Sequence, residues 1–286
     1  MSIILKASEI IESKLPELKR GVDQLVKKGV RPKMKVILVG SHPASVIYTN
    51  NKKKFCEKIG ALCEILRLPE DINEQELAAK IGEIADDRST HGLFVQLPLP
   101  THLANFDFER LIPAEKDVDG FNSGNLIKLL KGDCGVDALI PCTPKGIISL
   151  LNFYNIKIAG ANVVVIGRSL IVGKPMSMLL TNHDATVTLC HSQTKNLVEL
   201  TKTADIIILA TGRIEFFDAT YISKAKKQTI IDVGIGHNKQ GKLSGDAKFI
   251  DLAGIVHAIS PVPGGVGPMT IFSLIQNLLQ AAEKSI

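Results

Sequence analysis

The chain has 286 residues, of which 45% are hydrophobic and 22% charged, and its formal net charge is +5. This composition is typical of a globular protein with one large or two ordinary domains, and it excludes a chain that is disordered throughout. The charge is too small and too dispersed to predict binding to nucleic acid, although it suits an anionic small substrate. No apolar run approaches the ~18 residues of a membrane span, and acidic residues near the start argue against a secretory signal.

Helix and strand patterns alternate through the first half of the chain. The expected elements are a helix over about 7–29 with Pro16 inside it, a strand at 35–40, a lysine-rich helix, a strand at 61–68, a helix at 73–87, and a strand from Gly92 that Pro98 ends. Strands that are almost wholly apolar and separated by helices are typical of a parallel sheet covered on both faces.

The lysine-rich helix, VIYTNNKKKFCEKIG at 46–60, separates its lysines by position. At 100° per residue, Tyr48 and Lys52 fall on an apolar stripe about 100° wide, whereas Lys53, Lys54 and Lys58 fall outside it. A lysine among apolar neighbours loses hydration, which lowers its pKa and favours proton transfer near neutral pH. The alternative is that Lys52 covers the core with its stem and keeps its ammonium group in water.

The second half of the chain repeats the alternation. A helix at 143–154 joins the two halves, and the elements expected after it are strands at 162–167, 185–190, 205–212 and 229–234, helices at 174–182 and 195–203, and a final helix at about 268–284. We therefore predict an α/β protein of two units with parallel sheets and a cleft between them, the second unit being a Rossmann-like dinucleotide-binding domain.

The stretch VVVIGRSLIVGKPM at 163–176 reads as a buried strand, a turn with two glycines and a helix start. Such a turn presents backbone N–H groups to a phosphate, but Ser169 replaces the second glycine of the usual G-x-G-x-x-G motif, so a plain strand–helix turn stays open. The next strand ends without the acid that binds an NAD ribose. Arg168 and Ser192 could instead hold a 2′-phosphate, which favours NADP, unless Arg168 is simply a solvated loop residue.

Three further motifs carry polar groups. VQLPLP at 95–100 places Gln96 inside an apolar strand, as a buried structural amide or as a site residue at the carboxyl end of that strand. KDVDGF at 116–121 contains Asp117 and Asp119, which could merely cap their own turn. SPVPGGVGPMT at 260–270 is a Gly/Pro loop that enters a helix; such loops approach ligands closely, although most are simply turns.

Together these stretches resemble the bifunctional methylenetetrahydrofolate dehydrogenase/methenyltetrahydrofolate cyclohydrolase family. The matching pieces appear in the family's order and are YTNNK, VQLPLP, DVDGF, PCTPKG, GRSLIVGKPM, TVTLCHSQT, DVGI and PVPGGVGPMT. The resemblance implies NADP-dependent oxidation of 5,10-methylenetetrahydrofolate to the methenyl form, followed by hydrolysis to 10-formyltetrahydrofolate. It also implies a cytoplasmic enzyme of one-carbon metabolism that serves purine and amino-acid biosynthesis, and a homodimer formed through the nucleotide units.

The resemblance also implies roles for individual residues. Lys52 would move protons with Gln96 orienting it, Tyr48 would pack against the folate, and Asp119 would anchor the pterin. The cofactor would contact Gly167, Arg168, Ser169, Ser192 and Ile235, and the tetrahydrofolate substrate, with or without a polyglutamate tail, would also contact Pro263, Gly264 and Gly265. We expect residues 1–140, completed by the helix at 264–286, to form the folate domain and 141–263 to form the NADP domain.

The sequence departs from the family pattern at two places. After DVDGF the family usually continues with His-Pro, where this chain has Asn122 and Ser123, and although Asn125 is retained, Ile127 stands where the family has glycine. Gly236 stands where an asparagine usually follows DVGI. Neither change affects the residues expected to transfer protons, but both concern the rim of the folate pocket and the nicotinamide contact.

Three other functions remain open from the sequence. A shikimate-dehydrogenase-like enzyme would share the two-unit plan, a nucleotide-binding sensor would not need Lys52 on the apolar stripe, and a family member could retain one activity alone. The cysteines form no C-x-x-C pair, so we expect free thiols and no metal site; they are Cys56, Cys63, Cys134, Cys142 and Cys190.

Overall fold

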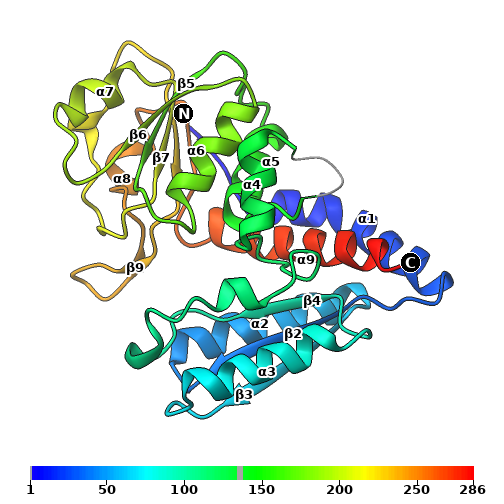
Figure 1. Cartoon of the computed structure of the whole chain (residues 1–286). Coiled ribbons are helices and arrows are strands. Elements are labelled where there is room, and N and C mark those ends of the chain that lie inside the picture. Colours follow the sequence, from blue (N-terminus) through cyan, green and yellow to red (C-terminus); the bar gives the residue numbers. More distant parts are fainter. Residues whose placement is uncertain (1, 134–137) are drawn as a thin grey trace. The chain divides into compact units, whose positions relative to one another are not determined.

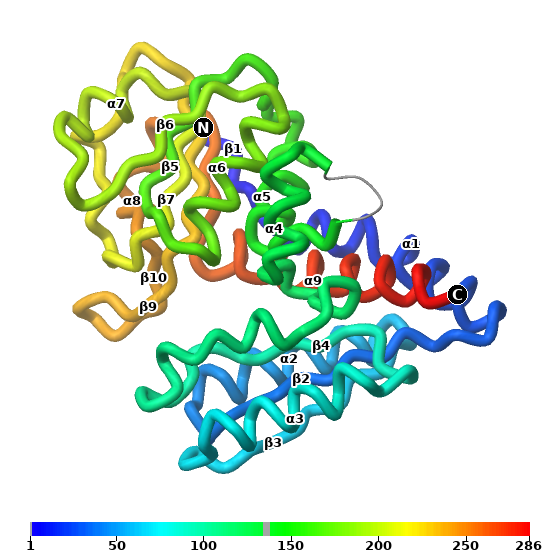
Figure 2. The backbone as a smooth tube through the Cα atoms, viewed as in Figure 1, coloured from blue at the N-terminus to red at the C-terminus, as the bar shows by residue number. Residues whose placement is uncertain are grey.

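The computed structural model describes residues 2–133 and 138–286, and the chain divides into two compact units (Figure 1). Unit 1 comprises the N-terminal segment through Ser13 and Thr143–Phe272, and unit 2 comprises Lys14–Cys142 and Ser273–Ile286. In both units parallel strands alternate with helices, as the traced backbone in Figure 2 shows. The predicted α/β class with two parallel-sheet units is therefore confirmed. The assignment of one domain to folate and the other to NADP stays a prediction.

Two helices contribute to both units. The helix α1 (Ala7–Lys27) passes from unit 1 into unit 2 after Ser13, and it remains one helix despite Pro16 inside it. The final helix α9 (Val266–Lys284) passes from unit 1 into unit 2 after Phe272. The N-terminal segment also contributes the short strand β1 (Ile3–Ile4) to the sheet of unit 1.

The sheet of unit 2 has the strand order β3-β2-β4, and all its pairings are parallel. Its strands are β2 (Lys33–Val39), β3 (Leu62–Leu68) and β4 (Gly92–Val95), joined through the helices α2 (Pro43–Ile59) and α3 (Glu74–Asp86). Because β3 and β4 lie on opposite sides of β2, right-handed crossovers place α2 and α3 on opposite faces of the sheet. Both faces of the central strand are thus covered.

The core of unit 2 forms where α3 packs against the sheet. Leu77 and Ile81 of α3 are completely buried against Ile37 of β2 and Val95 of β4. The helix begins at a capping box, in which the Asn73 side chain accepts a hydrogen bond from the backbone N–H of Glu76 and the Glu76 side chain binds back. This cap satisfies N–H groups that the first helical turn would otherwise leave unpaired.

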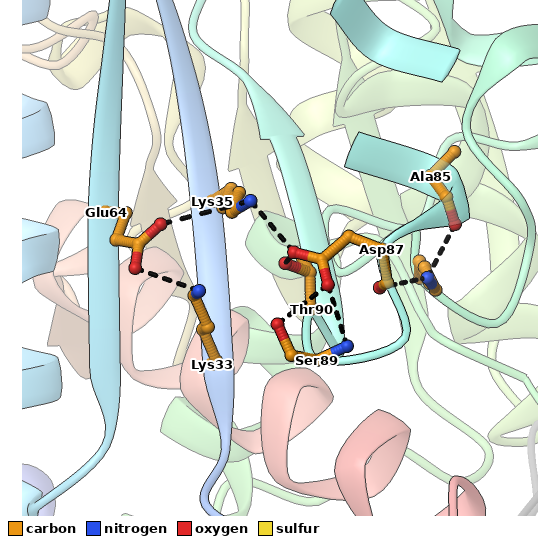
Figure 3. A network of polar contacts seen from close by, with 8 residues as sticks. Lys33, Lys35, Glu64, Ala85, Asp87, Ser89 and Thr90 are labelled. Atoms are coloured by element: carbon orange, nitrogen blue, oxygen red, sulfur yellow. Dashed lines mark hydrogen bonds and ion pairs between the residues drawn. The ribbon is translucent and has the colours of Figure 1, made fainter. Parts of the chain in front are cut away.

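A polar network joins the amino-terminal ends of β2 and β3 to the loop before β4 (Figure 3). Lys35 Nζ lies 2.9 Å from the carboxylate of Asp87 and 4.0 Å from Glu64, which in turn lies 2.9 Å from Lys33. Asp87 also accepts hydrogen bonds from Ser89 and Thr90, and these contacts hold the pKa of its carboxyl far below its usual range. This end of the sheet is stabilised by charge, which leaves the carboxyl ends of the strands for a site.

Several connections complete unit 2. Two short 3₁₀ helices follow β4, η1 (Thr101–Leu103) and η2 (Phe108–Leu111), and they are followed by the helix α4 (Ser123–Lys131). The helix α4 was not expected from the sequence. Asn122 caps its first turn by accepting a hydrogen bond from the Gly124 N–H at 2.7 Å, and Gly132 ends it in the left-handed conformation.

The larger sheet of unit 1 has the strand order β1-β11-β8-β7-β5-β6, with parallel pairing throughout. Its other strands are β5 (Asn162–Ile166), β6 (Thr186–Cys190), β7 (Ile206–Leu209), β8 (Thr229–Asp232) and β11 (Ala258–Ile259). The remaining elements of the unit are α5 (Cys142–Phe153), α6 (Gly173–Asn182), α7 (Leu197–Thr203), η3 (Ala219–Tyr221), α8 (Phe249–Leu252) and the antiparallel pair β9 (Gly236–His237) and β10 (Leu243–Ser244).

The order of strands in unit 1 creates a topological switch point. The chain passes from β5 outward to β6 and then returns to β7 on the other side of β5. In an open parallel sheet, ligands bind beyond the carboxyl ends of the strands at such a point. The loops after β5 and β7 are therefore the expected place for a dinucleotide. Across the part of the chain that the structure describes, no helix is long and apolar enough to cross a membrane.

Candidate active site

Lys52 is buried, as its position on the apolar stripe of α2 predicts. Lys52 is 5% exposed, and it lies on the same face of the helix as Cys56 and Ile59. Lys53 and Lys54 on the same helix are exposed. The alternative that Lys52 extends its ammonium group into water is therefore wrong.

The Lys52 amine has polar and aromatic partners inside unit 2. Its Nζ donates a 2.9 Å hydrogen bond to Oε1 of Gln96 and lies 3.6 Å from the centre of the Phe94 ring. Burial lowers the pKa of Lys52 from 10.5 to about 8, although the nearby Asp119 opposes this change. The amine can therefore gain or lose a proton near neutral pH.

Gln96 differs from its predicted setting. The strand β4 ends at Val95, so Gln96 lies just beyond the strand and not inside it, and its side chain is half-buried. Its backbone N–H still donates to Ile37 O at 2.9 Å, which fixes its place at the carboxyl end of the sheet. The side-chain amide donates to Leu97 O at 2.6 Å, and this bond turns Oε1 toward Lys52.

Tyr48 lies one turn before Lys52 on α2 and is half-buried. Burial raises the pKa of its phenol above the ordinary value of 10.0, so the hydroxyl stays protonated at neutral pH. A neutral tyrosine at this position offers a ring for packing and an O–H for hydrogen bonding. The role of Tyr48 in binding folate remains a prediction.

Asp117 and Asp119 have different surroundings although they are two residues apart. The carboxylate of Asp117 is 3% exposed and accepts hydrogen bonds from the N–H groups of Gly120 at 3.0 Å and Asn122 at 2.6 Å, and from Asn125 Nδ2 at 3.2 Å. Asp117 is thus the structural cap of this turn. The capping role that the turn motif left open for both aspartates therefore holds for Asp117, whose replacement should lower stability.

Asp119 is the carboxylate of this turn that interacts with Lys52. Burial raises the pKa of Asp119 to about 6, and the charge of Lys52 is the largest influence in the other direction. The thiol of Cys142 also stabilises the ionised form through a hydrogen bond. Gly120 has φ +84°, and a Cβ there would lie 2.5 Å from the backbone N of Pro141. Only glycine therefore fits at position 120, where the chain turns after Asp119.

A pocket in unit 2 adjoins this carboxylate. It is lined by residues of β4, of η2 and of the 117–121 turn, including Phe94, Leu97, Glu109, Asp117 and Asp119. Lys52 and Gln96 contact each other at this end of the sheet, and the charge of Lys52 acts on Asp119; the catalytic roles of the three residues stay predictions.

Two contacts of this site escaped the sequence reading. Phe94 lies under the Lys52 amine, and Cys142 is completely buried with its thiol 3.1 Å from Val118 O. The alternation along β4, which directs Phe94 toward the α2 face, could have indicated the first contact. The second joins residues more than 20 positions apart and left no local signal.

The departures around Asn122 have a structural account. Asn122 caps α4, and its Nδ2 donates to Ile112 O at 2.9 Å. Asn125, which the chain retains, is 1% exposed and donates to Ala114 O at 2.9 Å. Gly236 packs closely, because a Cβ there would lie 2.9 Å from Ile214 Cδ1.

The turn after β5 in unit 1 is shaped by its glycines. Gly167 has φ +127°, and a Cβ there would lie 2.2 Å from Ala210 O; a Cβ at Gly173 would lie 1.9 Å from Gly167 O. The Ser169 hydroxyl accepts hydrogen bonds from the N–H groups of Val172 and Gly173 at 3.2 and 3.4 Å. The turn therefore brings bare backbone to the switch point, as a dinucleotide requires.

Arg168 and Ser192 lie at matching positions of neighbouring strands. Ile166 of β5 pairs with Cys190 of β6, and each exposed side chain follows two residues later. This register supports the expectation that both face one ligand group at the carboxyl edge. Ile235, which is 50% exposed, follows β8 at the same edge.

The Pro263–Gly265 segment belongs to unit 1 and precedes α9. Pro263 and Gly264 are exposed, whereas Gly265 is buried and donates its N–H to Pro261 O at 2.8 Å. The O atom of Gly264 accepts a hydrogen bond from Ala7 N at 2.9 Å, which fixes this loop beside the start of α1. Its contact with substrate remains a prediction. Among the cysteines, Cys134 lies outside the described residues, and the others are buried and form no disulfide with one another: Cys56, Cys63, Cys142 and Cys190.

Two protein-family models match the chain. The model "Tetrahydrofolate dehydrogenase/cyclohydrolase, catalytic domain" matches residues 5–119, and the model "Tetrahydrofolate dehydrogenase/cyclohydrolase, NAD(P)-binding domain" matches residues 141–286. The "Bifunctional protein FolD" of Ligilactobacillus salivarius is 47% identical over 266 residues, which cover 93% of this chain and 91% of that protein.

Solved structures agree with these matches. The bifunctional methylenetetrahydrofolate dehydrogenase/cyclohydrolase FolD of Campylobacter jejuni is 38% identical with a TM-score of 0.95, and the alignment covers 100% of both chains. The Trypanosoma brucei enzyme, solved with NADP cofactor and an inhibitor, is 30% identical with a TM-score of 0.92, and the alignment covers 99% of this chain and 98% of that one.

Proposed function

Because the chain belongs to the tetrahydrofolate dehydrogenase/cyclohydrolase family, we propose that it oxidises 5,10-methylenetetrahydrofolate to the methenyl form and then hydrolyses this to 10-formyltetrahydrofolate. NADP, when bound, would accept the hydride in the first step. A shikimate-dehydrogenase-like enzyme or a sensor would leave the Lys52–Gln96 contact without a task. The observation that carries the proposal is this buried amine, whose pKa is lowered to about 8 and which lies 2.9 Å from Gln96 Oε1.

The hydride step needs mainly placement of the folate. Asp119 accepts hydrogen bonds from the pterin amine and ring N–H, and Tyr48 packs against the folate. On the cofactor side, the glycines of the 167–173 turn leave room for a pyrophosphate, and Arg168 with Ser192 suits a 2′-phosphate. Proximity and alignment of the two reacting carbons then lower the barrier.

The hydrolytic step needs proton transfer. Water attacks the methenyl carbon, and the neutral form of Lys52 accepts the proton that this water loses. The bond from that carbon to one ring nitrogen then breaks; the hydroxyl that came from water loses its remaining proton as the formyl C=O forms, and the nitrogen takes up a proton. Gln96 orients the Lys52 amine through Oε1, and the Phe94 ring stabilises the ammonium form by a cation–π contact.

The test compares three lysines of one helix. Lys52→Met removes the amine, so cyclohydrolase activity should fall by roughly 10²–10⁴-fold, the usual value of general acid–base catalysis. Lys53→Met and Lys54→Met are the matched controls, because both residues are exposed on α2. Formation of NADPH and decay of the methenyl chromophore are followed separately, which also detects a protein that retains one activity alone. Equal losses in the three variants would point to a diffuse charge effect and contradict the proposal.

We further propose a cytoplasmic homodimer that serves purine and amino-acid biosynthesis. Support for the dimer comes from β6, which lies at the edge of the sheet order of unit 1 with Leu189 36% exposed. An edge strand can pair with the same strand of a second copy. Sedimentation of the wild type and of Leu189→Lys tests this: a monomeric wild type, or an unchanged dimer in the variant, would contradict this contact.

A further inference from the structure

Unit 1 contains two buried aspartates that the proposed mechanism does not use. Asp232 ends β8 and is 3% exposed, and Asp246 follows β10 and is 0% exposed. Buried carboxylates are costly unless donors surround them. These two lie at the carboxyl edge of the sheet, where the cofactor loops begin.

Asp246 holds the loop after β7. Its Oδ2 accepts hydrogen bonds from the Thr211 N–H at 2.7 Å, the Thr211 hydroxyl at 2.8 Å and the Gly212 N–H at 3.2 Å. Its Oδ1 is buried and has no hydrogen-bond partner within the described residues. Within the described residues, all the hydrogen bonds that the Asp246 side chain accepts therefore come from this one loop.

Asp232 holds the loop after β8 and the segment that carries Asp246. Its Oδ1 accepts from the N–H groups of Gly234 at 3.0 Å and Asp246 at 2.9 Å, and its Oδ2 accepts from Ala247 N–H at 2.8 Å. Both oxygens of Asp232 are thus engaged. Burial and the neighbouring Asp246 raise the pKa of Asp232 to about 7, against the effect of these N–H donors.

Two glycines let the carboxylates interlock. A Cβ at Gly234 would lie 2.3 Å from Asp246 Oδ1, and a Cβ at Gly245 would lie 2.1 Å from Asp232 Oδ2. Each carboxylate therefore packs directly against backbone of the segment next to the other. The loop after β7, the loop after β8 and the 245–247 segment form one hydrogen-bonded assembly.

This assembly adjoins the candidate cofactor residues. Ile235 follows Gly234, and the carbonyl of Ala210, which precedes Thr211, lies so close to Gly167 that a Cβ at Gly167 would be 2.2 Å from it. We propose that Asp232 and Asp246 are positioning residues for the dinucleotide, which fix the loops after β7 and β8 in the conformation that binds it. This inference rests on the proposed NADP-dependent activity.

The test separates the two activities of one protein. Asp246→Ala should raise KM for NADP by roughly ten- to a hundredfold, because several hydrogen bonds to one charged acceptor are lost together. Hydrolysis of the methenyl substrate, assayed without NADP, should stay within about twofold of wild type, since the residues proposed for it lie in unit 2. Asp205→Ala is the matched control: Asp205 accepts from Asn162 N–H at 2.9 Å and from Lys226, at the opposite ends of the strands.

Asparagine substitutions distinguish the two carboxylates. Asp246→Asn should bind NADP almost normally, because one amide oxygen can replace Oδ2 and the amide NH₂ takes the unpartnered position. Asp232→Asn should impair NADP binding, since an NH₂ would then face an N–H that needs an acceptor. If the two aspartates only stabilised the fold, the two Asn variants would be impaired to a similar extent, and each would lose both activities in parallel.

A milder pair keeps the test valid if Asp246→Ala fails to fold. Thr211→Val removes one donor to Asp246 together with the acceptor of the Arg213 N–H, and Thr220→Val removes a 2.6 Å contact to the half-buried Asp218. We expect KM for NADP to rise about threefold for Thr211→Val, the loss of one modest hydrogen bond, and to stay unchanged for Thr220→Val. Equal KM values in the two threonine variants, or an Asp246→Asn defect as large as that of Asp246→Ala, would overturn the inference. A wild type that reduces no NADP would instead refute the proposed function.

Discussion

The buried charge of Lys52 should destabilise the folded protein at neutral pH. Lys52→Met keeps the stem of the side chain and removes the amine, so it separates the cost of burying the charge from the packing of α2. A base with a lowered pKa in the folded state contributes stability that is present above its unfolded pKa and lost as pH falls through its folded pKa. Lys52 therefore lowers the free energy of unfolding most below about pH 8 and little above pH 10.5.

The magnitude follows from the change in pKa. A difference of one pKa unit corresponds to about 1.4 kcal/mol, so lowering the pKa of Lys52 from 10.5 to about 8 costs about 3 kcal/mol at pH 7. Loss of the hydrogen bond to Gln96 offsets about 1 kcal/mol of this gain in the variant. Lys52→Met should thus raise the free energy of unfolding by about 2 kcal/mol at pH 7.

Chemical denaturation at two pH values provides the assay. The stabilisation should shrink by about 2 to 3 kcal/mol between pH 7 and pH 10, because the folded Lys52 loses its proton above about pH 8 and no charge is then buried. Lys53→Met is the control and should change stability little at either pH, since Lys53 is exposed. A less stable Lys52→Met protein at pH 7, or a gain independent of pH, would refute the reasoning that burial of charge sets the pKa.

Four further substitutions test other parts of the molecule. Asp119→Ala should weaken folate binding in calorimetry and damage both activities with little change in melting temperature, and wild-type binding should weaken as pH falls through about 6, where Asp119 takes up a proton; normal binding by the variant would place the pterin anchor elsewhere. Asp117→Ala should instead lower the melting temperature clearly, because three donors lose their acceptor. Arg168→Ala should weaken NADP about ten- to a hundredfold in titrations and NAD little, and a parallel loss would mean that Arg168 only shapes its loop. Asp87→Asn should cost about 1 kcal/mol at pH 7, and since the folded pKa of Asp87 is lowered, this difference should begin to shrink as pH falls below 3.8 and vanish only below the folded pKa; a constant difference would exclude the charge of Lys35 as its cause.

Local patterns predicted the elements whose exposure alternates cleanly. The apolar stripe of α2 identified Lys52 because helical periodicity distinguishes it from the lysines beside it. The helix α4 was missed although Asn122 and Gly132 mark its ends. Its outward positions carry Ile127 and Leu130, which are 51% and 65% exposed and therefore obscure the pattern.

Beyond Lys52, the residues of the candidate site were predictable only where a motif supplied them. Gln96 and Asp119 were identified by resemblance, and nothing local distinguished Asp119 from Asp117 in the same turn. The distinction comes from partners at Asn122, Asn125 and Cys142, which the fold brings together. Contacts between residues far apart in sequence leave no periodic signal, which is why the 232–246 pair also escaped the sequence reading.

Lys52 and Asp119 owe their shifted pKa values to the same burial that lowers the stability of the fold. In water, a lysine and an aspartate with pKa values of 10.5 and 3.8 differ so much that moving a proton from one to the other costs about 9 kcal/mol. In the fold, Lys52 at about 8 and Asp119 at about 6 differ by only about 2, which corresponds to about 3 kcal/mol. Between these pH values both groups remain charged, so the site can anchor a pterin and still exchange a proton with bound water at little cost.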